Sequence, residues 1–215
     1  MQELMVTAPG KLAWIDSPSP QLASPGGAIV RPIASASCDL DRRLIAGATP
    51  FKAPFAIGHE CVAEVLQTGE NVRSVQRGDL VCVPWKIACG QCAQCLRGLS
   101  TACTAVQKYA AYGVPAGGHW GGLFSEEVYV PFADAMLVPL PEGTNPLAVA
   151  SASDNLTDAW VAASTPIKRY TDAHVLVVGG TESLGVLAVQ MARAAGAGQV
   201  DYLDTDDYRR ALAEL

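Results

Sequence analysis

The stretch HVLVVGGTESLGVLAVQMARAAGA, residues 174–197, predicts the fold of the C-terminal part of this chain. Residues 175–178 form a continuous apolar run, which is typical of a strand buried in a parallel sheet. A glycine-bearing turn and a segment with apolar residues at helical spacing follow. QVDYLD (199–204) then predicts a second strand and DDYRRALAEL (206–215) a second helix. This order of elements is the opening of a doubly wound α/β sheet.

The turn after the first of these strands suits a dinucleotide pyrophosphate, because a glycine-rich turn places it at a helix N-terminus. Gly180, Leu184 and Gly185 are the candidate contacts of the cofactor. Asp204 follows Gly185 by 19 residues, where an acidic side chain hydrogen-bonds the ribose hydroxyls and disfavours a 2′-phosphate. The pattern therefore predicts NAD rather than NADP, although an aspartate at a strand end is also common turn chemistry.

The first 140 residues have a different character, rich in Gly, Pro and Val, with short runs of β propensity. The predicted strands are ELMVTA (3–8), KLAWID (11–16), GAIVRPIASAS (27–37), ECVAEVLQTG (60–69), DLVCVP (79–84) and EEVYVP (126–131). Residues 145–164 then show apolar positions at helical spacing. We predict an irregular β-barrel over residues 1–145, and a connecting helix with an incomplete doubly wound domain over 146–215.

Four of the seven cysteines predict a metal site in the long aperiodic segment between Val83 and Glu127. They are Cys89, Cys92, Cys95 and Cys103, with the spacing C-x2-C-x2-C-x7-C. Four thiolates at such spacing can enclose zinc and leave no open position, which indicates a structural site. The alternatives are free thiols and an iron–sulfur cluster, but the ferredoxin pattern has a shorter last gap followed by proline.

A second metal site is predicted from residues farther apart in the sequence. Cys38 follows a predicted strand and His59 follows a turn glycine, and both are ligand types that suit zinc. Asp154 is the best candidate for a third ligand, with a helix N-cap or an exposed carboxylate as its alternative role. Three protein ligands would leave a fourth position open, as in a catalytic zinc site.

Composition and charge exclude several other classes of protein. The net charge is -6, and the 15 Lys and Arg residues do not cluster, which argues against a nucleic-acid partner. No apolar run approaches the length of a membrane span, and the first residues do not resemble a secretory signal. We therefore expect a cytoplasmic protein whose cysteines bind metal rather than form disulfides.

These motifs together resemble the zinc-dependent medium-chain alcohol dehydrogenases, and the ligand pattern resembles the formaldehyde dehydrogenase-like members. The resemblance rests on Cys38 with Asp41 and Gly47, the triplet Gly58-His59-Glu60, the CGQCAQC segment with Cys103, and VLVVGG at 175–180. It implies a GroES-like barrel that carries both zinc ions, followed by a Rossmann domain that binds NAD(P). It also implies catalytic zinc ligands at Cys38, His59 and Asp154, with Glu60 beside the zinc. The implied substrate is a small alcohol or aldehyde, and a homo-oligomer is compatible with the family.

Several positions depart from the pattern of that family. Leu40 stands where the family has a Ser or Thr that starts a proton relay, and Glu182 replaces the middle glycine of the cofactor turn. Asp158 replaces a threonine near the nicotinamide, and only two strands of about six are evident in the second domain. We therefore expect an N-terminal portion or short form of such an oxidoreductase. The alternative is a catalytically silent, zinc-stabilised binding module built on the same scaffold.

Overall fold

The computed structural model describes residues 1–170, 172–180 and 183–214, which form two compact units. The first unit spans Met1–Ser153 and the second spans Asp154–Leu215. The units are described separately below, and the predicted domain boundary at residue 145 stays a prediction.

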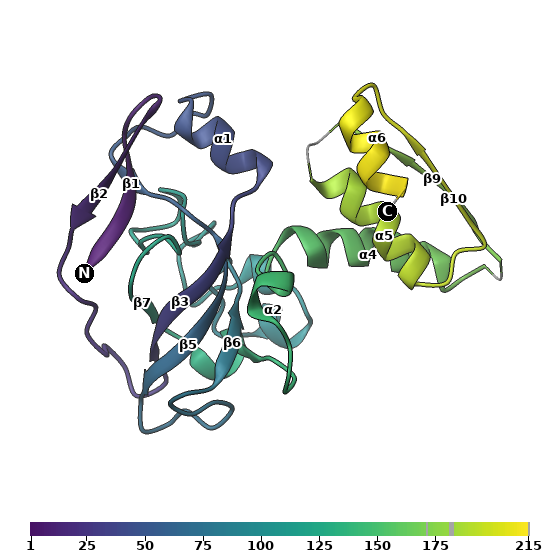
Figure 1. Ribbon diagram of the computed structural model, residues 1–215. Helices are drawn as coiled ribbons and strands as arrows, with labels where there is room; N and C mark the ends of the chain where they lie inside the picture. The colour runs from purple at the N-terminus through teal and green to yellow at the C-terminus, as the bar shows by residue number, and fades with distance from the viewer. Residues whose placement is uncertain (171, 181–182, 215) are drawn as a thin grey trace. The chain divides into compact units, whose positions relative to one another are not determined.

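The first unit is built on two antiparallel sheets, drawn in purple to teal in Figure 1. The larger sheet has the strand order β7-β3-β5-β6-β8, and the smaller has the order β2-β1-β4. The strands are β1 (Gln2–Ala8), β2 (Lys11–Asp16), β3 (Ala28–Ala36), β4 (Phe55–Ala56), β5 (Glu60–Thr68), β6 (Leu80–Val83), β7 (Val128–Val130) and β8 (Val138–Pro139). All six predicted strands are confirmed.

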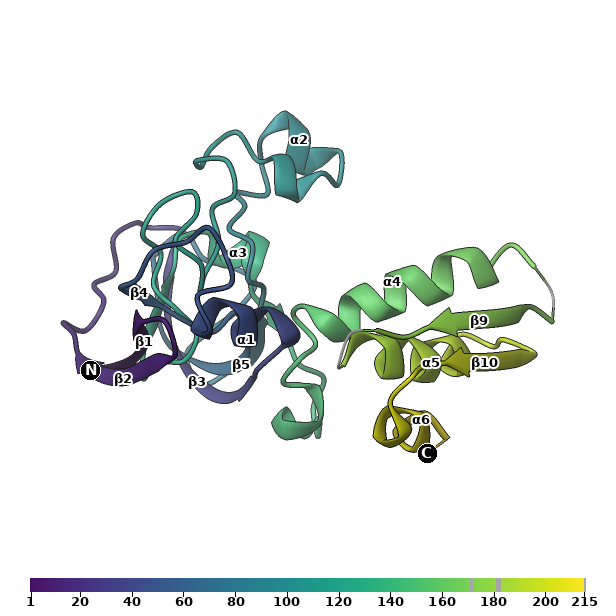
Figure 2. The same cartoon turned by 90° about the horizontal axis from the view of Figure 1, so that it is seen from above.

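The core of the first unit lies under β3, β5 and β6, whose valines and alanines are buried together with Tyr112 and Leu123. Short helical segments connect the strands: α1 (Asp39–Ile45), α2 (Ala93–Leu96), α3 (Ala133–Met136) and the 3-10 turns Ser100–Ala102 and Pro146–Val149. The segment that carries α2 projects from the barrel as a separate lobe (Figure 2). Its small core includes Ala88, Cys89 and Cys103. A long loop without regular structure therefore folds around its cysteines.

The second unit contains two parallel strands, β9 (His174–Val178) and β10 (Gln199–Leu203). Three helices accompany them: α4 (Asn155–Ile167), α5 (Leu184–Ala194) and α6 (Asp207–Glu214). Ala163 and Ile167 of α4 and Ala192 of α5 form the core, against which Val175 and Val200 of the strands pack. The predicted strand–helix–strand–helix order is confirmed.

The helical segment predicted over residues 145–164 is wrong in its first half. The structure has a 3-10 turn at Pro146–Val149 and begins α4 only at Asn155. Asp154 interrupts the helix because its backbone, with φ -145 and ψ -92, lies outside the helical region. Apolar spacing alone could not reveal this break, since the spacing continues across it.

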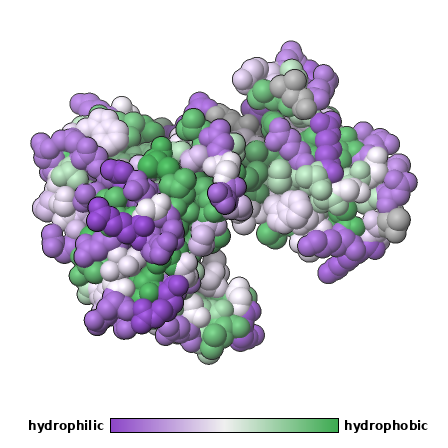
Figure 3. All heavy atoms as spheres, turned by 60° about the horizontal axis from the view of Figure 1, so that its bottom comes forward, coloured by the Kyte–Doolittle hydropathy of each residue, from purple (hydrophilic) through white to green (hydrophobic). Residues whose placement is uncertain are grey.

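One face of the β9–β10 sheet is exposed, because α4 and α5 cover only the other face. Leu176, Val178 and Leu203 are 62%, 66% and 61% exposed on the open face. Val178 and Leu203 are direct neighbours in the parallel register. We call these three residues the open sheet face. Elsewhere, hydrophilic and apolar residues alternate over the surface visible in Figure 3.

No helix in the described part of the chain has the length and apolar character needed to cross a membrane.

Candidate metal centres

The first candidate centre lies where β3 ends and β5 begins. Ala36 at the end of β3 pairs with Glu60 at the start of β5. This register places Cys38, two residues past β3, beside His59, one residue before β5. The Cys38 Sγ and the His59 Nε2 are 3.0 Å apart, and both side chains are buried. Sheet pairing thus brings together two ligand types that lie 21 positions apart in the sequence.

Asp41 holds both members of this pair in place. One carboxylate oxygen accepts the backbone N–H of Cys38 at 3.0 Å, and the other lies 3.2 Å from the Nδ1 of His59. The aspartate is itself 1% exposed. The two atoms are close enough for an electrostatic contact but are not aligned as a hydrogen bond. Negative charge beside Nδ1 favours a proton on that nitrogen, which leaves Nε2, the nitrogen that faces the Cys38 sulfur, with its lone pair.

Cys38 also begins helix α1. Its sulfur accepts the backbone N–H of Leu40 at 3.3 Å, and Asp41 completes a reciprocal capping box. The sulfur of Cys38 is the atom that would bind metal. The same contacts therefore start the helix and prepare a ligand. The Leu40 side chain has no group that could carry a proton.

The donor set fits a zinc ion. Cys38, His59 and Glu60 each offer a ligand atom, and these atoms lie within 4.8 Å of one another. Glu60 is fully buried as the first residue of β5, so its carboxyl group faces the protein interior. Sulfur, imidazole and carboxylate are the ligand types that zinc takes, at bond lengths of about 2.0–2.3 Å. The predicted residues Cys38, His59, Glu60 and Asp41 are thus brought together within the first unit.

Asp154, the predicted third ligand, is the first residue of the second unit. It follows Ser153. Burial and the charge of Glu60 raise the pKa of the Cys82 thiol, whereas the interaction with Ser153 lowers it, so Ser153 and Glu60 both lie near that thiol. The chain therefore leaves the first unit close to the candidate centre. Asp154 occupies the N-cap position of α4, but its side chain makes no cap hydrogen bond. The structure therefore places Asp154 at the helix start that the capping alternative named, without the side-chain hydrogen bond of a cap, and its role as a ligand stays a prediction.

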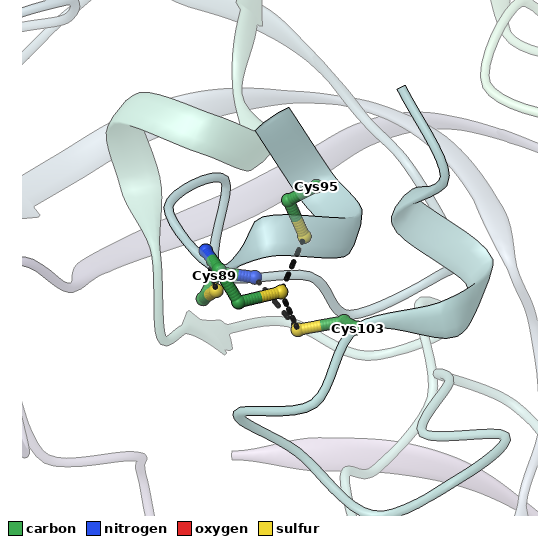
Figure 4. Close-up of side chains that lie close together, drawn as sticks. Cys89, Cys95 and Cys103 are labelled. Atoms are coloured by element: carbon green, nitrogen blue, oxygen red, sulfur yellow. Dashed lines mark hydrogen bonds between the residues drawn. The ribbon is translucent and has the colours of Figure 1, made fainter. Parts of the chain in front are cut away.

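The second candidate centre is the cysteine lobe around α2. The sulfurs of Cys89, Cys92, Cys95 and Cys103 lie within 4.8 Å of one another. The sulfur of Cys92 is 3.5 Å from that of Cys95 and 4.0 Å from that of Cys103. Figure 4 shows the side chains of Cys95 and Cys103 turned toward a common centre, close to Cys89. Four convergent thiols are the donor set of a closed structural zinc site.

Backbone N–H groups point at sulfurs of the lobe. The N–H of Cys89 points at the Cys103 sulfur, and the N–H of Cys92 points at the Cys89 sulfur. Hydrogen bonds from Thr104 and Cys95 lower the pKa of Cys92 to about 5. Burial and the neighbouring Cys92 raise the pKa of Cys95. A metal ion would displace the protons that remain, because zinc binds thiolates.

Trp85 is a neighbour of the first centre, although an aromatic residue met in a sequence is more often part of the core than of a pocket lining. Its ring centroid lies 6.2 Å from that of His59. The ammonium of Lys86 lies 4.4 Å from the Trp85 ring centroid and 5.7 Å from that of Tyr109. The only signal in the sequence was the position of Trp85 at the end of a predicted strand, which does not distinguish a site wall from core.

The predicted cofactor turn follows β9. Gly180 has φ +134, and no atom lies within 4 Å of where a side chain would begin. Leu184 and Gly185 open helix α5. A Cβ at Gly185 would lie 3.1 Å from the hydroxyl of Tyr202, so this glycine allows close packing of helix and strand. Glu182, predicted to obstruct the pyrophosphate, lies outside the described residues.

Asp204, predicted to bind the ribose, already has partners. The hydroxyl of Tyr202 donates to its carboxylate at 2.6 Å, and the backbone N–H of Asp206 donates at 2.9 Å. Arg209 donates from Nε at 2.9 Å and from Nη2 at 2.8 Å. These bonds, with that of Arg209 foremost, hold the pKa of Asp204 well below its usual range. Sequence reasoning missed Tyr202 and Arg209, since neither residue type marks such a contact.

Known proteins resemble this chain in sequence and in fold. The family model of the alcohol dehydrogenase GroES-like domain matches residues 24–142. A zinc-type alcohol dehydrogenase B of Aspergillus flavus is 30% identical over 81% of this chain and 40% of its own length. A glutathione-independent formaldehyde dehydrogenase of Pseudomonas aeruginosa is 30% identical over 96% of this chain and 54% of its own length.

Among solved structures, the alcohol dehydrogenase of Thermus sp. ATN1 superposes with a TM-score of 0.87 at 28% identity. The superposition covers 100% of this chain and 61% of that one. The chain spans about half the length of the curated relatives it matches. The domain match covers more than half of this chain. The chain therefore belongs to the zinc-dependent medium-chain alcohol dehydrogenase family.

Proposed function

We propose that this chain carries the metal-binding half of an oxidoreductase that transfers hydride between an alcohol or aldehyde and NAD(P). The observation that carries the proposal is the buried pair of Cys38 and His59, 3.0 Å apart, with Asp41 on the far nitrogen of the ring. A buried thiol and imidazole in contact, with a carboxylate beside the far ring nitrogen, provide two of the four ligands of a zinc site.

Cys38, His59 and Asp154 would hold the catalytic zinc, and Glu60 would stand beside it. When bound, the zinc supplies a Lewis acid for the substrate oxygen. Asp41 keeps Nε2 of His59 available and orients Cys38 through its backbone N–H. The barrel core around Glu60 and His59 excludes water from one side of the site. The lobe cysteines would hold a second zinc, which would cross-link the loop between β6 and β7.

Proton transfer cannot pass through position 40. Leu40 is 37% exposed and has an aliphatic side chain, whereas the family places a hydroxyl there. The proton of the alcohol must therefore leave through water or through another polar group. We propose that the missing hydroxyl at position 40 lowers the rate of alcohol oxidation and has a smaller effect on the affinity for metal.

The proposal is tested by counting metal ions. Two zinc ions per chain are expected from the two clusters, and Asp154→Ala should lose one of them while the lobe retains its own. Asp158→Ala, on the same helix, is the matched control and should keep both. The measurement is metal content by mass spectrometry after gel filtration. Retention of both ions by Asp154→Ala would show that Asp154 is not a ligand.

A second function has a specific observation in its favour. Leu40 removes the relay hydroxyl, which favours a catalytically silent, zinc-stabilised binding module. The two functions differ in one measurement, the formation of reduced nicotinamide by the zinc-loaded chain with simple alcohols. Formation of product supports the enzyme. Two bound zinc ions without binding of either nicotinamide dinucleotide in calorimetry support the silent module.

A further inference from the structure

The outer edge of β2 is unpaired in the part of the chain that the structure describes. β2 (Lys11–Asp16) bonds to β1 on its inner side and forms one edge of the three-stranded sheet. Figures 1 and 2 both draw it at the margin of the first unit. An unpaired edge presents a row of backbone N–H and C=O groups that another strand can bind.

The hydrogen bonds to β1 decide which residues of β2 present those groups outward. Met1 and Ser17 exchange two bonds, since the backbone nitrogen of each donates to the carbonyl oxygen of the other at 2.9 Å. Bonded and non-bonded pairs alternate along an antiparallel ladder. Positions 13 and 15 therefore turn their backbone groups toward β1, whereas Leu12, Trp14 and Asp16 turn theirs outward.

The other neighbours of β1 give the same assignment. Leu4 is aligned with Trp14, and its N–H donates to the carbonyl oxygen of Phe124 at 2.8 Å, away from β2. Gln2 is aligned with Asp16, and its carbonyl oxygen accepts a backbone N–H from the segment before β7 at 3.0 Å. Neither pair is bonded within the hairpin, so the backbone groups of Trp14 and Asp16 face the open edge.

The side chains along this edge are apolar and exposed. Trp14 is 58% exposed and Leu12 is 43% exposed. Natural sheets protect an edge with charged side chains, proline or bulges, and positions 12–15, LAWI, contain neither a charge nor a proline. The centre of the strand therefore has the features that favour pairing with another strand.

A second copy of the same edge is complementary to it. In an antiparallel pair, the residues that exchange hydrogen bonds must be those whose backbone groups face each other. Positions 12, 14 and 16 can therefore align with 16, 14 and 12 of a second copy, and this register uses the outward groups of all three. Trp14 then lies opposite its own copy on a two-fold axis, which is the commonest symmetry of protein dimers. Aromatic pairs across strands stabilise such a contact.

Charge complementarity favours the same register. Lys11 would lie opposite Ser17 of the second copy, on one face of the joined sheet. The Ser17 hydroxyl donates to the carboxylate of Glu3. The Lys11 ammonium would thus meet the Glu3 carboxylate of the second copy, and the two-fold axis repeats this pair. Opposite charges on adjoining strands stabilise their pairing, whereas like charges weaken it.

We propose that β2 is a dimerisation strand, which pairs antiparallel with β2 of a second copy about a two-fold axis at Trp14. The small sheets of the two copies would then form one continuous sheet. This contact is separate from the open sheet face. It is also independent of the proposed function, because it uses no residue of either metal cluster.

Charges introduced at position 14 test both the contact and its register. Trp14→Lys puts two ammonium groups opposite each other, and Trp14→Glu puts two carboxylates opposite each other. Each variant alone should dimerise about tenfold more weakly than its parent. An equimolar mixture puts the introduced ammonium opposite the introduced carboxylate, so it should associate at least about threefold more tightly than either variant alone. Sedimentation equilibrium measures these constants, with Val178→Thr and Leu203→Thr present throughout to weaken contacts through the open sheet face.

Leu147→Lys and Leu147→Glu are the matched controls. Leu147 is 77% exposed and lies outside both sheets, so these variants should associate like the parent, alone and mixed. Circular dichroism checks the fold of each variant.

Amide exchange of the unsubstituted chain gives a readout that needs no variant. The amides of Leu12, Trp14 and Asp16 should exchange at least about threefold more slowly as the protein concentration rises, because pairing protects them. Those of Ala13 and Ile15 already bond to β1 and should exchange slowly at every concentration. Association through the open sheet face would leave all five amides unchanged.

Three results would overturn the proposal. One is a chain that stays monomeric at the concentrations used for magnetic resonance. Another is a chain that associates while the exchange of the Leu12, Trp14 and Asp16 amides does not change. The third is a mixture of folded Trp14→Lys and Trp14→Glu that associates no more tightly than either variant alone.

Discussion

His59 shows how a single buried side chain is prepared for metal binding. Its Nε2 faces the sulfur of Cys38 and its Nδ1 faces Asp41, which also holds the backbone of Cys38. One aspartate therefore positions both ligands. The sequence made Cys38 and His59 candidates because of their residue types, and the family resemblance added Asp41. The contact that gives Asp41 its role arises only after β3 and β5 have paired.

Asp41→Asn should weaken metal binding at the first centre. An amide has one accepting oxygen, so it can serve the Cys38 N–H or His59 but not both. Loss of such a supporting contact lowers metal affinity about 10- to 100-fold. The measurement is competition with a chromophoric zinc chelator. Asp79→Asn is the control, since Asp79 likewise accepts a neighbouring backbone N–H but in the turn before β6. Equal affinity in the two variants would refute the role of Asp41.

The lowered pKa of Asp204 predicts that the stability of the protein depends on pH. Hydrogen bonds from Arg209 and Tyr202 lower its pKa in the folded state, so the ionised form is preferentially stabilised by folding. That stability is fully present above the unfolded pKa of about 3.9 and is lost as the pH falls below it.

The test compares the unfolding free energy of wild type and Asp204→Asn between neutral and acidic pH. Wild type should be the more stable at neutral pH, and the difference should shrink below about pH 4. Asp201→Asn, which removes an exposed carboxylate from β10, the strand that ends just before Asp204, should show a smaller and flatter difference. If the difference in unfolding free energy between wild type and Asp204→Asn grew as the pH fell, the lowered pKa assigned to Asp204 would be contradicted.

The lobe around α2 depends on glycines that permit tight turns. Gly90 and Gly98 both have left-handed backbones, with φ +72 and +76. They differ in surroundings, because a Cβ at Gly90 would lie 2.6 Å from the Cβ of Ala135, whereas Gly98 faces open space. The spacing of the cysteines was sufficient to predict this lobe. The contact with Ala135 was not predictable, since it depends on how α3 packs.

Gly90→Ala should therefore destabilise the first unit more than Gly98→Ala. The left-handed backbone costs about 1–2 kcal/mol at either position. The clash at Gly90 adds about 1 kcal/mol or more. Thermal unfolding of the zinc-loaded chain and retention of the lobe zinc measure the difference. If the two variants melt alike, the lobe does not pack on α3 as described.

Helix α1 is an element that pattern reasoning did not predict. Its seven residues, DLDRRLI, are too few for a clear apolar period, and its cap is a cysteine rather than a usual capping residue. By contrast, β9, α5 and β10 were predicted because each has a complete apolar pattern. Sequence reasoning thus identifies elements that bury a face, and misses those that exist because of a local polar contact.

At the scale of the whole molecule, the open sheet face is an apolar area that the second unit exposes. Leu176, Val178 and Leu203 lie there with more than half of each side chain in contact with solvent. Apolar clusters on a sheet favour association with other surfaces. The apolar pattern of the two strands was evident in the sequence, but only the strand register shows that Val178 and Leu203 lie side by side on this face.

The chain should self-associate in a manner that depends on its concentration. Val178→Thr combined with Leu203→Thr keeps the strand propensity and should weaken association roughly tenfold, because less apolar surface is buried. Sedimentation equilibrium at several concentrations measures this. Leu147→Thr replaces a leucine that is 77% exposed outside the sheet and serves as control. If the double variant associated as strongly as wild type, the surface that mediates self-association would not be the open sheet face.

Cys38 gives one sulfur atom two tasks, as the cap of α1 and as a candidate zinc ligand. When the sulfur is held by metal, it stays fixed as an acceptor for the N–H of Leu40. When the metal leaves, the thiol can rotate and the first turn of the helix can fray. The exchange of the Leu40 and Asp41 amides with deuterium should therefore report the occupancy of a metal that is itself spectroscopically silent.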